Sequence, residues 1–119
     1  MALTIWHNPS CSTCRKTLAR IIDAGVEPDV RRYLDDPPIP AELDSALERL
    51  GLEPWELVRM KEPLAAELGL TDLARDAATR ADWIAILSAN PRLIERPVVL
   101  ADDGRAVIAR PPEKVAELL

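Results

Sequence analysis

The ten residues from His7 to Lys16 carry the most reactive side chains of the chain, including both of its cysteines. They read HNPSCSTCRK and place Cys11 and Cys14 in a C-x-x-C pair. A strand is predicted before the pair and a helix after it, so Cys11 should lie at a helix N-terminus. Free backbone N–H groups and the helix dipole stabilise a thiolate there. We therefore expect a lowered pKa for Cys11 and nucleophilic or redox chemistry.

Side chains close to Cys11 in the sequence could assist this chemistry. Arg15 and Lys16 add positive charge one helical turn further on, and the free N–H groups form a cradle for an oxyanion. His7 ends the predicted strand, where it either has a functional role, lowering the Cys11 pKa or handling a proton, or hydrogen-bonds the loop backbone. Asn8 either contacts an anion or serves as a turn residue.

The cysteine pair also has two plainer interpretations: a buried, inert pair or half of a zinc site. Zinc is disfavoured because there is no second cysteine pair and His7 is the only histidine. The Asp and Glu residues form no cluster with the spacing of metal ligands. The sequence therefore predicts no bound metal.

Three arginines stand at the ends of predicted elements, where sites on α/β sheets form. Arg59 follows an apolar pair, Arg96 precedes Pro97 at the start of a strand, and Arg110 follows the last strand. Spacing alone does not bring them together. If they converge, they suit a tetrahedral oxyanion, because a guanidinium offers paired donors and keeps its charge.

The elements that position these residues begin with a strand–helix–strand unit. Strands are expected at 3–7 and 30–34, with a helix at 11–24 between them, which fits a right-handed βαβ unit. The inner face of this helix is expected to be formed by Leu18, Ile21 and Ile22.

The remaining chain predicts several helices followed by a hairpin. After a break at residues 35–38, helices are expected at 41–50, 54–58, 63–68 and 80–89. Strands at 98–101 and 106–109 flank an Asp-Asp-Gly turn, and a last helix starts at Pro111 or Pro112 and runs to 118.

This order predicts one α/β domain over residues 1–119 with a thioredoxin-like mixed sheet. A helical insertion at about 40–90 separates the N-terminal βαβ part from the C-terminal ββα part. A flavodoxin-like fold is the main alternative, but it needs more parallel strands and fewer hairpins. In a thioredoxin-like fold, a cis proline faces the active cysteine, so Arg96–Pro97 is expected to be cis.

Composition limits the function classes. The 119 residues suit one domain, and the net charge of −5 argues against a general nucleic-acid binder. The N-terminus lacks the pattern of a signal peptide, and no apolar stretch approaches the length of a membrane span. We expect a cytoplasmic monomer without membrane attachment, in which the cysteines are reduced outside a catalytic cycle.

Taken together, five motifs resemble the arsenate reductase family of the glutaredoxin-coupled type, which includes the Spx transcription regulators. The resemblance covers nearly the whole chain. It is carried by HNPSCSTCRKTL at 7–18, YLDDPP at 33–38, ELVRMKEP at 56–63, NPRLIERPVV at 90–99 and ARPPEKV at 109–115.

The resemblance implies a role for each matching residue. The nucleophile of the family matches Cys11. Three arginines that bind and stabilise the oxyanion match Arg59, Arg96 and Arg110. The substrate loop around the nucleophile matches His7, Asn8, Ser12 and Arg15.

The family mechanism implies arsenate as the substrate and no bound cofactor. The Cys11 thiolate attacks arsenate, glutathione resolves the adduct, and glutaredoxin, or thioredoxin in its place, reduces the resulting disulfide as the partner protein. Cys14 departs from the best-studied reductases and is a possible resolving cysteine.

Two alternatives follow from the cysteine pair. One is a general thiol–disulfide oxidoreductase that uses Cys11 and Cys14. The other is a redox-sensing regulator similar to Spx, which carries such a pair and binds RNA polymerase. The complete set of three arginines favours the reductase.

Overall fold

The computed structural model describes residues 2–119 and divides into two compact units. The first, here called the thiol unit, consists of the chain up to Asp36 together with Arg96–Leu119. The second, the helical unit, is Pro37–Glu95 and contains the predicted insertion. The expectation of a single domain over 1–119 stays a prediction.

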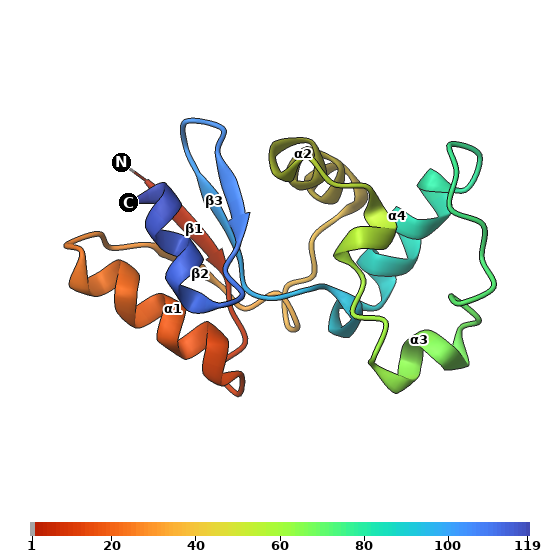
Figure 1. The fold of residues 1–119 in the computed structure, drawn as a ribbon, viewed down its shortest axis with the longest axis horizontal. Helices are drawn as coiled ribbons and strands as arrows, with labels where there is room; N and C mark the ends of the chain where they lie inside the picture. Colours follow the sequence, from red (N-terminus) through yellow and green to blue (C-terminus); the bar gives the residue numbers. More distant parts are fainter. Residues whose placement is uncertain (1) are drawn as a thin grey trace. The chain divides into compact units, whose positions relative to one another are not determined.

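The thiol unit is built on a four-stranded mixed sheet with the order β2-β1-β3-β4 (Figure 1). The strands are β1 (Leu3–Trp6), β2 (Asp29–Arg31), β3 (Val98–Ala101) and β4 (Ala106–Ile108). β1 pairs parallel with β2 and antiparallel with β3, and β3 and β4 form the hairpin. This topology confirms the predicted thioredoxin-like α/β class.

Helix α1 (Ser12–Asp23) links β1 to β2 and packs against η3 (Pro112–Leu118), a 3-10 helix that ends the chain. The core between these helices and the sheet is aliphatic. It contains Leu3, Ile5, Ile21, Val99, Ala101, Ala109, Val115 and Leu118.

The predicted inner face of α1 is partly wrong. Ile22 is 57% exposed, and the buried residues of α1 are Cys14, Thr17 and Ile21. These three follow one helical stripe, and Ile22 lies about 100° further round the helix. Thr17 can occupy the stripe because its hydroxyl donates to the Thr13 carbonyl at 2.8 Å, which leaves no unsatisfied polar group.

Strand β2 is shorter and begins earlier than the predicted 30–34. The chain leaves the ladder after Arg31, because the amides of Asp35 and Asp36 bond the Arg32 carbonyl at 3.0 and 2.9 Å and form a turn. Tyr33 lies inside this turn and is nevertheless buried. The aromatic side chain that suggested a strand therefore belongs to a turn.

The helical unit contains three α-helices: α2 (Pro40–Leu50), α3 (Pro63–Glu67) and α4 (Arg80–Ala89). Two short 3-10 helices, η1 (Pro54–Leu57) and η2 (Pro91–Leu93), complete it. Its interior is organised by Trp83, whose indole N–H donates to the Ala74 carbonyl at 2.8 Å. The ring of Trp55 packs edge-on against Trp83 with centroids 6.3 Å apart.

The predicted helix at 54–58 is a single 3-10 segment that ends before Val58. Val58 is extended and forms an isolated antiparallel bridge with Ile94. The amide of Glu95 donates to the Leu57 carbonyl at 2.8 Å, and the amide of Arg59 donates to the Leu93 carbonyl at 2.7 Å. Pairing with residues 93–95 therefore replaces the last helical turn.

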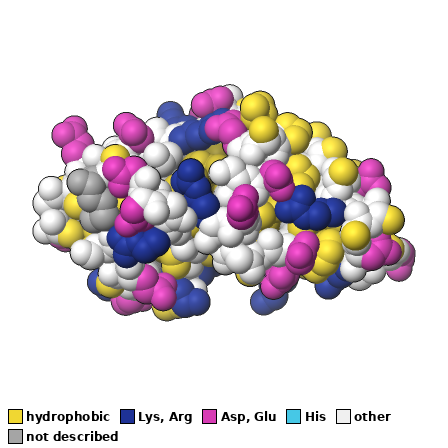
Figure 2. Space-filling view, turned by 90° about the horizontal axis from the view of Figure 1, so that it is seen from above, with side chains coloured by type: hydrophobic (Ala, Val, Ile, Leu, Met, Phe, Trp, Pro, Cys, Tyr) yellow, Lys and Arg dark blue, Asp and Glu magenta, His cyan; other side chains and the backbone are white. Residues whose placement is uncertain are grey.

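Acidic and basic side chains are interspersed over the face drawn in Figure 2. Within residues 2–119, no helix combines the length and the apolar character that crossing a membrane requires. In the same range, no group of three His, Cys, Asp or Glu side chains could hold a metal ion.

Candidate active site around Cys11

The sheet topology gathers four functional positions at one edge. β1 and β2 end there, β3 starts there, and β4 ends there, because β3 runs antiparallel to its neighbours. His7 directly follows β1, Arg96 lies two residues before the start of β3, and Arg110 lies two residues after the end of β4. The loop that carries Cys11 starts from the same edge.

This loop holds Cys11 at the N-cap position of α1, with φ −95° and ψ 121°. The Asn8 side-chain oxygen accepts the Ser10 amide at 3.0 Å, and the Asn8 carbonyl accepts the Cys11 amide at 3.0 Å. The His7 amide donates to the Arg31 carbonyl at 2.7 Å and anchors the loop to β2. Asn8 thus has the turn-forming contacts that one of its two interpretations required.

Cys11 is only 7% exposed, and its pKa reflects opposing effects. Burial raises the pKa. The guanidinium of Arg96 beside the sulfur, through hydrogen bonding and charge, and the amide and thiol of Cys14 lower it further than burial raises it, to about 7. The side chain is therefore about half thiolate at neutral pH.

Cys14 differs sharply from Cys11. It is 0% exposed, and burial, together with the neighbouring Cys11 sulfur, raises its pKa to about 11. At neutral pH Cys14 is therefore a thiol, whereas Cys11 is about half ionised to the thiolate. Cys11 is the nucleophile that the geometry favours.

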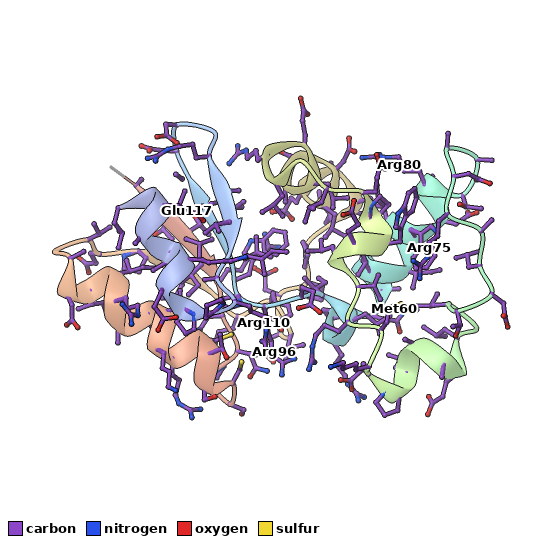
Figure 3. The ribbon with its side chains drawn as sticks, viewed as in Figure 1. Met60, Arg75, Arg80, Arg96, Arg110 and Glu117 are labelled. Carbon is purple, nitrogen blue, oxygen red and sulfur yellow. The ribbon has the colours of Figure 1, made fainter. Side chains whose placement is uncertain are left out.

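Arg96 and Arg110 are in direct contact. The Arg110 Nη1 donates to the Arg96 carbonyl at 3.0 Å, and Figure 3 shows the two side chains close together. The Arg96 Nε is buried and has no hydrogen-bond partner among the described residues. The Arg96–Pro97 bond is cis, as predicted, and Arg110–Pro111 is a second cis bond that the sequence analysis did not predict.

His7 is 6% exposed, and its Nδ1 has no hydrogen-bond partner within residues 2–119. Burial lowers the pKa of His7, and the positive charges of Arg32 and Arg15 lower it further. The imidazole is therefore neutral at neutral pH. His7 is not among the main groups that lower the pKa of Cys11, and its role in handling a proton stays a prediction.

Arg15 and Ser12 lie in the first turn of α1 and are exposed. The Arg15 Nη1 donates to the Pro9 carbonyl at 2.9 Å, which holds its side chain over the loop. Arg32 was missed by the sequence analysis. The predicted βαβ unit could have indicated Arg32. Two paired parallel strands end side by side, so a residue at the end of the second strand lies beside His7 at the end of the first.

Arg59 belongs to the helical unit. Its guanidinium is paired with the Glu62 carboxylate at 3.2 Å, and the same carboxylate accepts Arg92 at 2.7 Å. The thiol unit thus brings together Cys11, Arg96 and Arg110, whereas convergence of Arg59 with them stays a prediction.

The lowered pKa gives a direct expectation for reactivity. The rate of Cys11 alkylation by iodoacetamide should rise through a midpoint near pH 7, because the thiolate forms above this pKa. Unperturbed cysteine has its midpoint at about 8.5. The Cys14→Ser variant isolates the Cys11 signal, and a midpoint above pH 8 in that variant would contradict the assigned environment.

A mixed sheet of this order, a cysteine at the start of the first helix and a cis proline before β3 define a thioredoxin-like thiol protein. Comparison with known proteins then gives the family: the chain belongs to the ArsC family, whose family model matches residues 6–118.

Three relatives illustrate the similarity. An uncharacterized protein in the glnII region of Streptomyces viridochromogenes is 46% identical, covering 98% of each chain. An arsenate reductase of Rhizobium meliloti is 44% identical, covering 100% of this chain and 82% of the relative. The solved structure of an arsenate reductase from Vibrio cholerae is 42% identical and superposes with a TM-score of 0.89, covering 100% of this chain and 98% of that one.

Proposed function

We propose that the protein is a thiol-dependent reductase that converts arsenate to arsenite through Cys11. The observation that carries the proposal is a cysteine of lowered pKa at a helix start, beside a guanidinium with a buried, uncommitted donor. Relatives named arsenate reductase, at 37–44% identity over nearly the whole chain, support arsenate as the substrate.

In the first step, the Cys11 sulfur attacks arsenic and an S–As bond forms. One arsenate oxygen leaves as water after it takes up protons, so arsenic remains in the pentavalent state. The thiolate and arsenate are both anionic, and their repulsion must be offset by fixed positive groups. Arg96, Arg110 and the free amides at the start of α1 are the groups of the thiol unit that would do so.

In the second step, a second thiol attacks the Cys11 sulfur. An S–S bond forms, the S–As bond breaks, and its electron pair stays on arsenic, which leaves as arsenite. Each sulfur loses one electron and arsenic gains two. We propose glutathione as this thiol, because the thiol of Cys14 is buried and protonated at neutral pH.

Glutaredoxin, or thioredoxin in its place, would then reduce the mixed disulfide and restore Cys11. The proposal places this cycle in the cytoplasm, in a monomer that needs no bound cofactor. Glutathione acts in it as a co-substrate.

A coupled assay tests the proposal. NADPH oxidation is followed in the presence of arsenate, first with glutathione and glutaredoxin and then with thioredoxin in place of these two reductants. We expect arsenate-dependent NADPH consumption that requires glutathione. Turnover of disulfides without any arsenate reduction under either condition would instead favour the general oxidoreductase.

Arg59 is proposed as a third oxyanion ligand. In the helical unit its amide donates to the carbonyl of Leu93, three residues before Arg96 in the chain. Arg59→Lys should lower arsenate turnover about tenfold or more, because lysine lacks the paired donors of arginine.

Arg92→Lys is the matched control, since Arg92 shares the Glu62 carboxylate with Arg59 and is 64% exposed. It should leave turnover close to wild type. Equal losses in both variants would assign the effect to the ion pairs with Glu62 rather than to substrate binding.

A further inference from the structure

A second basic cluster lies on the other side of the Cys11 loop from Arg96. In the order β2-β1-β3-β4, the loop follows the inner strand β1, Arg96 belongs to the β3 side and Arg32 to the β2 side. The register pairs Trp6 with Arg31, so one further step along the two parallel strands places His7 beside Arg32. The loop therefore has an arginine on each flank.

The side chains of this second cluster are largely uncommitted. Arg32 makes no side-chain hydrogen bond or ion pair with any described residue. Arg15 uses one nitrogen on the Pro9 carbonyl, and its other donors have no partner within residues 2–119. Both guanidiniums lie close enough to His7 to lower its pKa. Two arginines gathered without a carboxylate between them form a site for an anion.

The buried imidazole gives an independent indication that something binds here. His7 is 94% buried, and its Nδ1 has no hydrogen-bond partner among the described residues. Buried polar atoms are rarely left without a partner, and one that is calls for a bound water, ion or ligand or for a catalytic role. A neutral imidazole near two guanidiniums can add a hydrogen bond to a carboxylate that they bind.

The ligand must be compatible with the reaction at Cys11. The oxyanion has its own donors on the Arg96 side, and Cys14 is buried as a protonated thiol, so the resolving thiol has to arrive from outside. Such a thiol needs an anchor that does not compete with the oxyanion. The β2 side of the loop provides one.

We propose that Arg32 and Arg15, with His7, form a docking site for a carboxylate of the small thiol that resolves the Cys11 adduct. Glutathione has this chemistry, with a thiol in the middle and carboxylates at both ends. The inference rests on the proposed function and adds the residues that bind its co-substrate. A carboxylate held at Arg32 would direct the glutathione sulfur toward the Cys11 sulfur.

The test uses a reaction that needs no arsenate, so that it remains informative if arsenate is not the substrate. The Cys11 thiolate attacks oxidised glutathione, which forms the Cys11–glutathione disulfide and releases glutathione thiolate. The same rate is measured with 2-hydroxyethyl disulfide, which has no carboxylate. The readout is the ratio of the two rate constants, followed by mass spectrometry in the Cys14→Ser background.

Arg32→Gln should lower this ratio about tenfold, the factor expected for loss of one charge-assisted hydrogen bond. Arg32→Lys keeps the charge and should lower it less. Arg49→Gln, which removes an exposed charge from α2, is the control and should leave the ratio unchanged.

Two results would overturn the proposal. One is an unchanged ratio in Arg32→Gln. The other is an equal loss with both disulfides, because Arg32 would then act on the thiolate and not on the carboxylate. Failure of arsenate reduction in the wild type, with the ratio still dependent on Arg32, would reject the proposed function and retain this site.

Discussion

Cys11→Ser will abolish arsenate reduction, whereas Cys14→Ser will keep most of the glutathione-dependent rate. The two sulfurs lie in one turn of the same helix, but their environments differ. Arg96 and the Cys14 amide stabilise the Cys11 thiolate and offset the effect of its burial, whereas burial keeps Cys14 protonated well above neutral pH. A hydroxyl is too weak a nucleophile to replace the thiolate at position 11.

Both variants are measured in the coupled assay, with thermal unfolding to verify the fold. Cys14 is 0% exposed, so Cys14→Ala serves as a second variant in case a buried hydroxyl destabilises the core. Loss of activity in the Cys14 variants as complete as in Cys11→Ser, with the fold intact, would mean that an internal disulfide is obligatory. The dithiol alternatives would then explain the protein better.

Arg96→Lys will lower arsenate turnover at least tenfold, and it will also raise the Cys11 pKa. The guanidinium of Arg96 lies beside the sulfur, and its buried Nε has no partner among the described residues. A lysine keeps the positive charge, but its single ammonium group replaces the planar, paired N–H donors of the guanidinium. Removing a donor aimed at developing charge commonly costs on the order of 100- to 1000-fold in rate.

Two measurements separate these effects. The alkylation profile gives the Cys11 pKa, and turnover at a pH well above it gives the contribution of oxyanion stabilisation alone. Arg20→Lys is the control, because Arg20 belongs to the same unit and pairs on the surface with Glu113 at 2.9 Å. Arsenate reduction by Arg96→Lys at the wild-type rate would refute the oxyanion site and favour a redox switch.

The sequence was sufficient to predict the sheet and the position of Cys11 at the start of a helix because those signals are local. The Asp-Asp-Gly turn predicts the β3–β4 hairpin, and an extended run followed by an amphipathic segment predicts the start of α1. The cis bond at Pro97 followed from the fold class and is confirmed. Each of these features depends on a few neighbouring residues.

The features that were missed depend on contacts between distant segments. Ile22 is exposed because the buried stripe of α1 is set by the elements packed against it, and β2 ends early because of the turn after Arg31. The pKa of His7 is lowered mainly by burial and then by the charge of Arg32, and both depend on segments that are near in the fold and far in the sequence. The type of a residue and its sequence neighbours do not show which distant residues will contact it in the fold.

The position of Cys11 at the N-cap of α1 has a consequence for the stability of the fold. Serine, threonine, aspartate or asparagine usually fill this position and accept an amide of the first turn. Here no side chain makes a cap hydrogen bond, but the Cys14 amide contributes to the lowered pKa of Cys11. A thiolate at this position therefore places a negative charge at the positive end of the helix dipole, where it stabilises the start of α1.

Because the pKa is lower in the folded protein than in the unfolded chain, deprotonation of Cys11 raises the free energy of unfolding. This contribution is complete above the unfolded pKa of about 8.5 and is lost as the pH falls through about 7. Any covalent bond to the sulfur, whether to arsenic or to glutathione, removes the same negative charge. The start of α1 thus has this stabilising charge only in the reduced protein, which favours release of every adduct and return to the free thiolate.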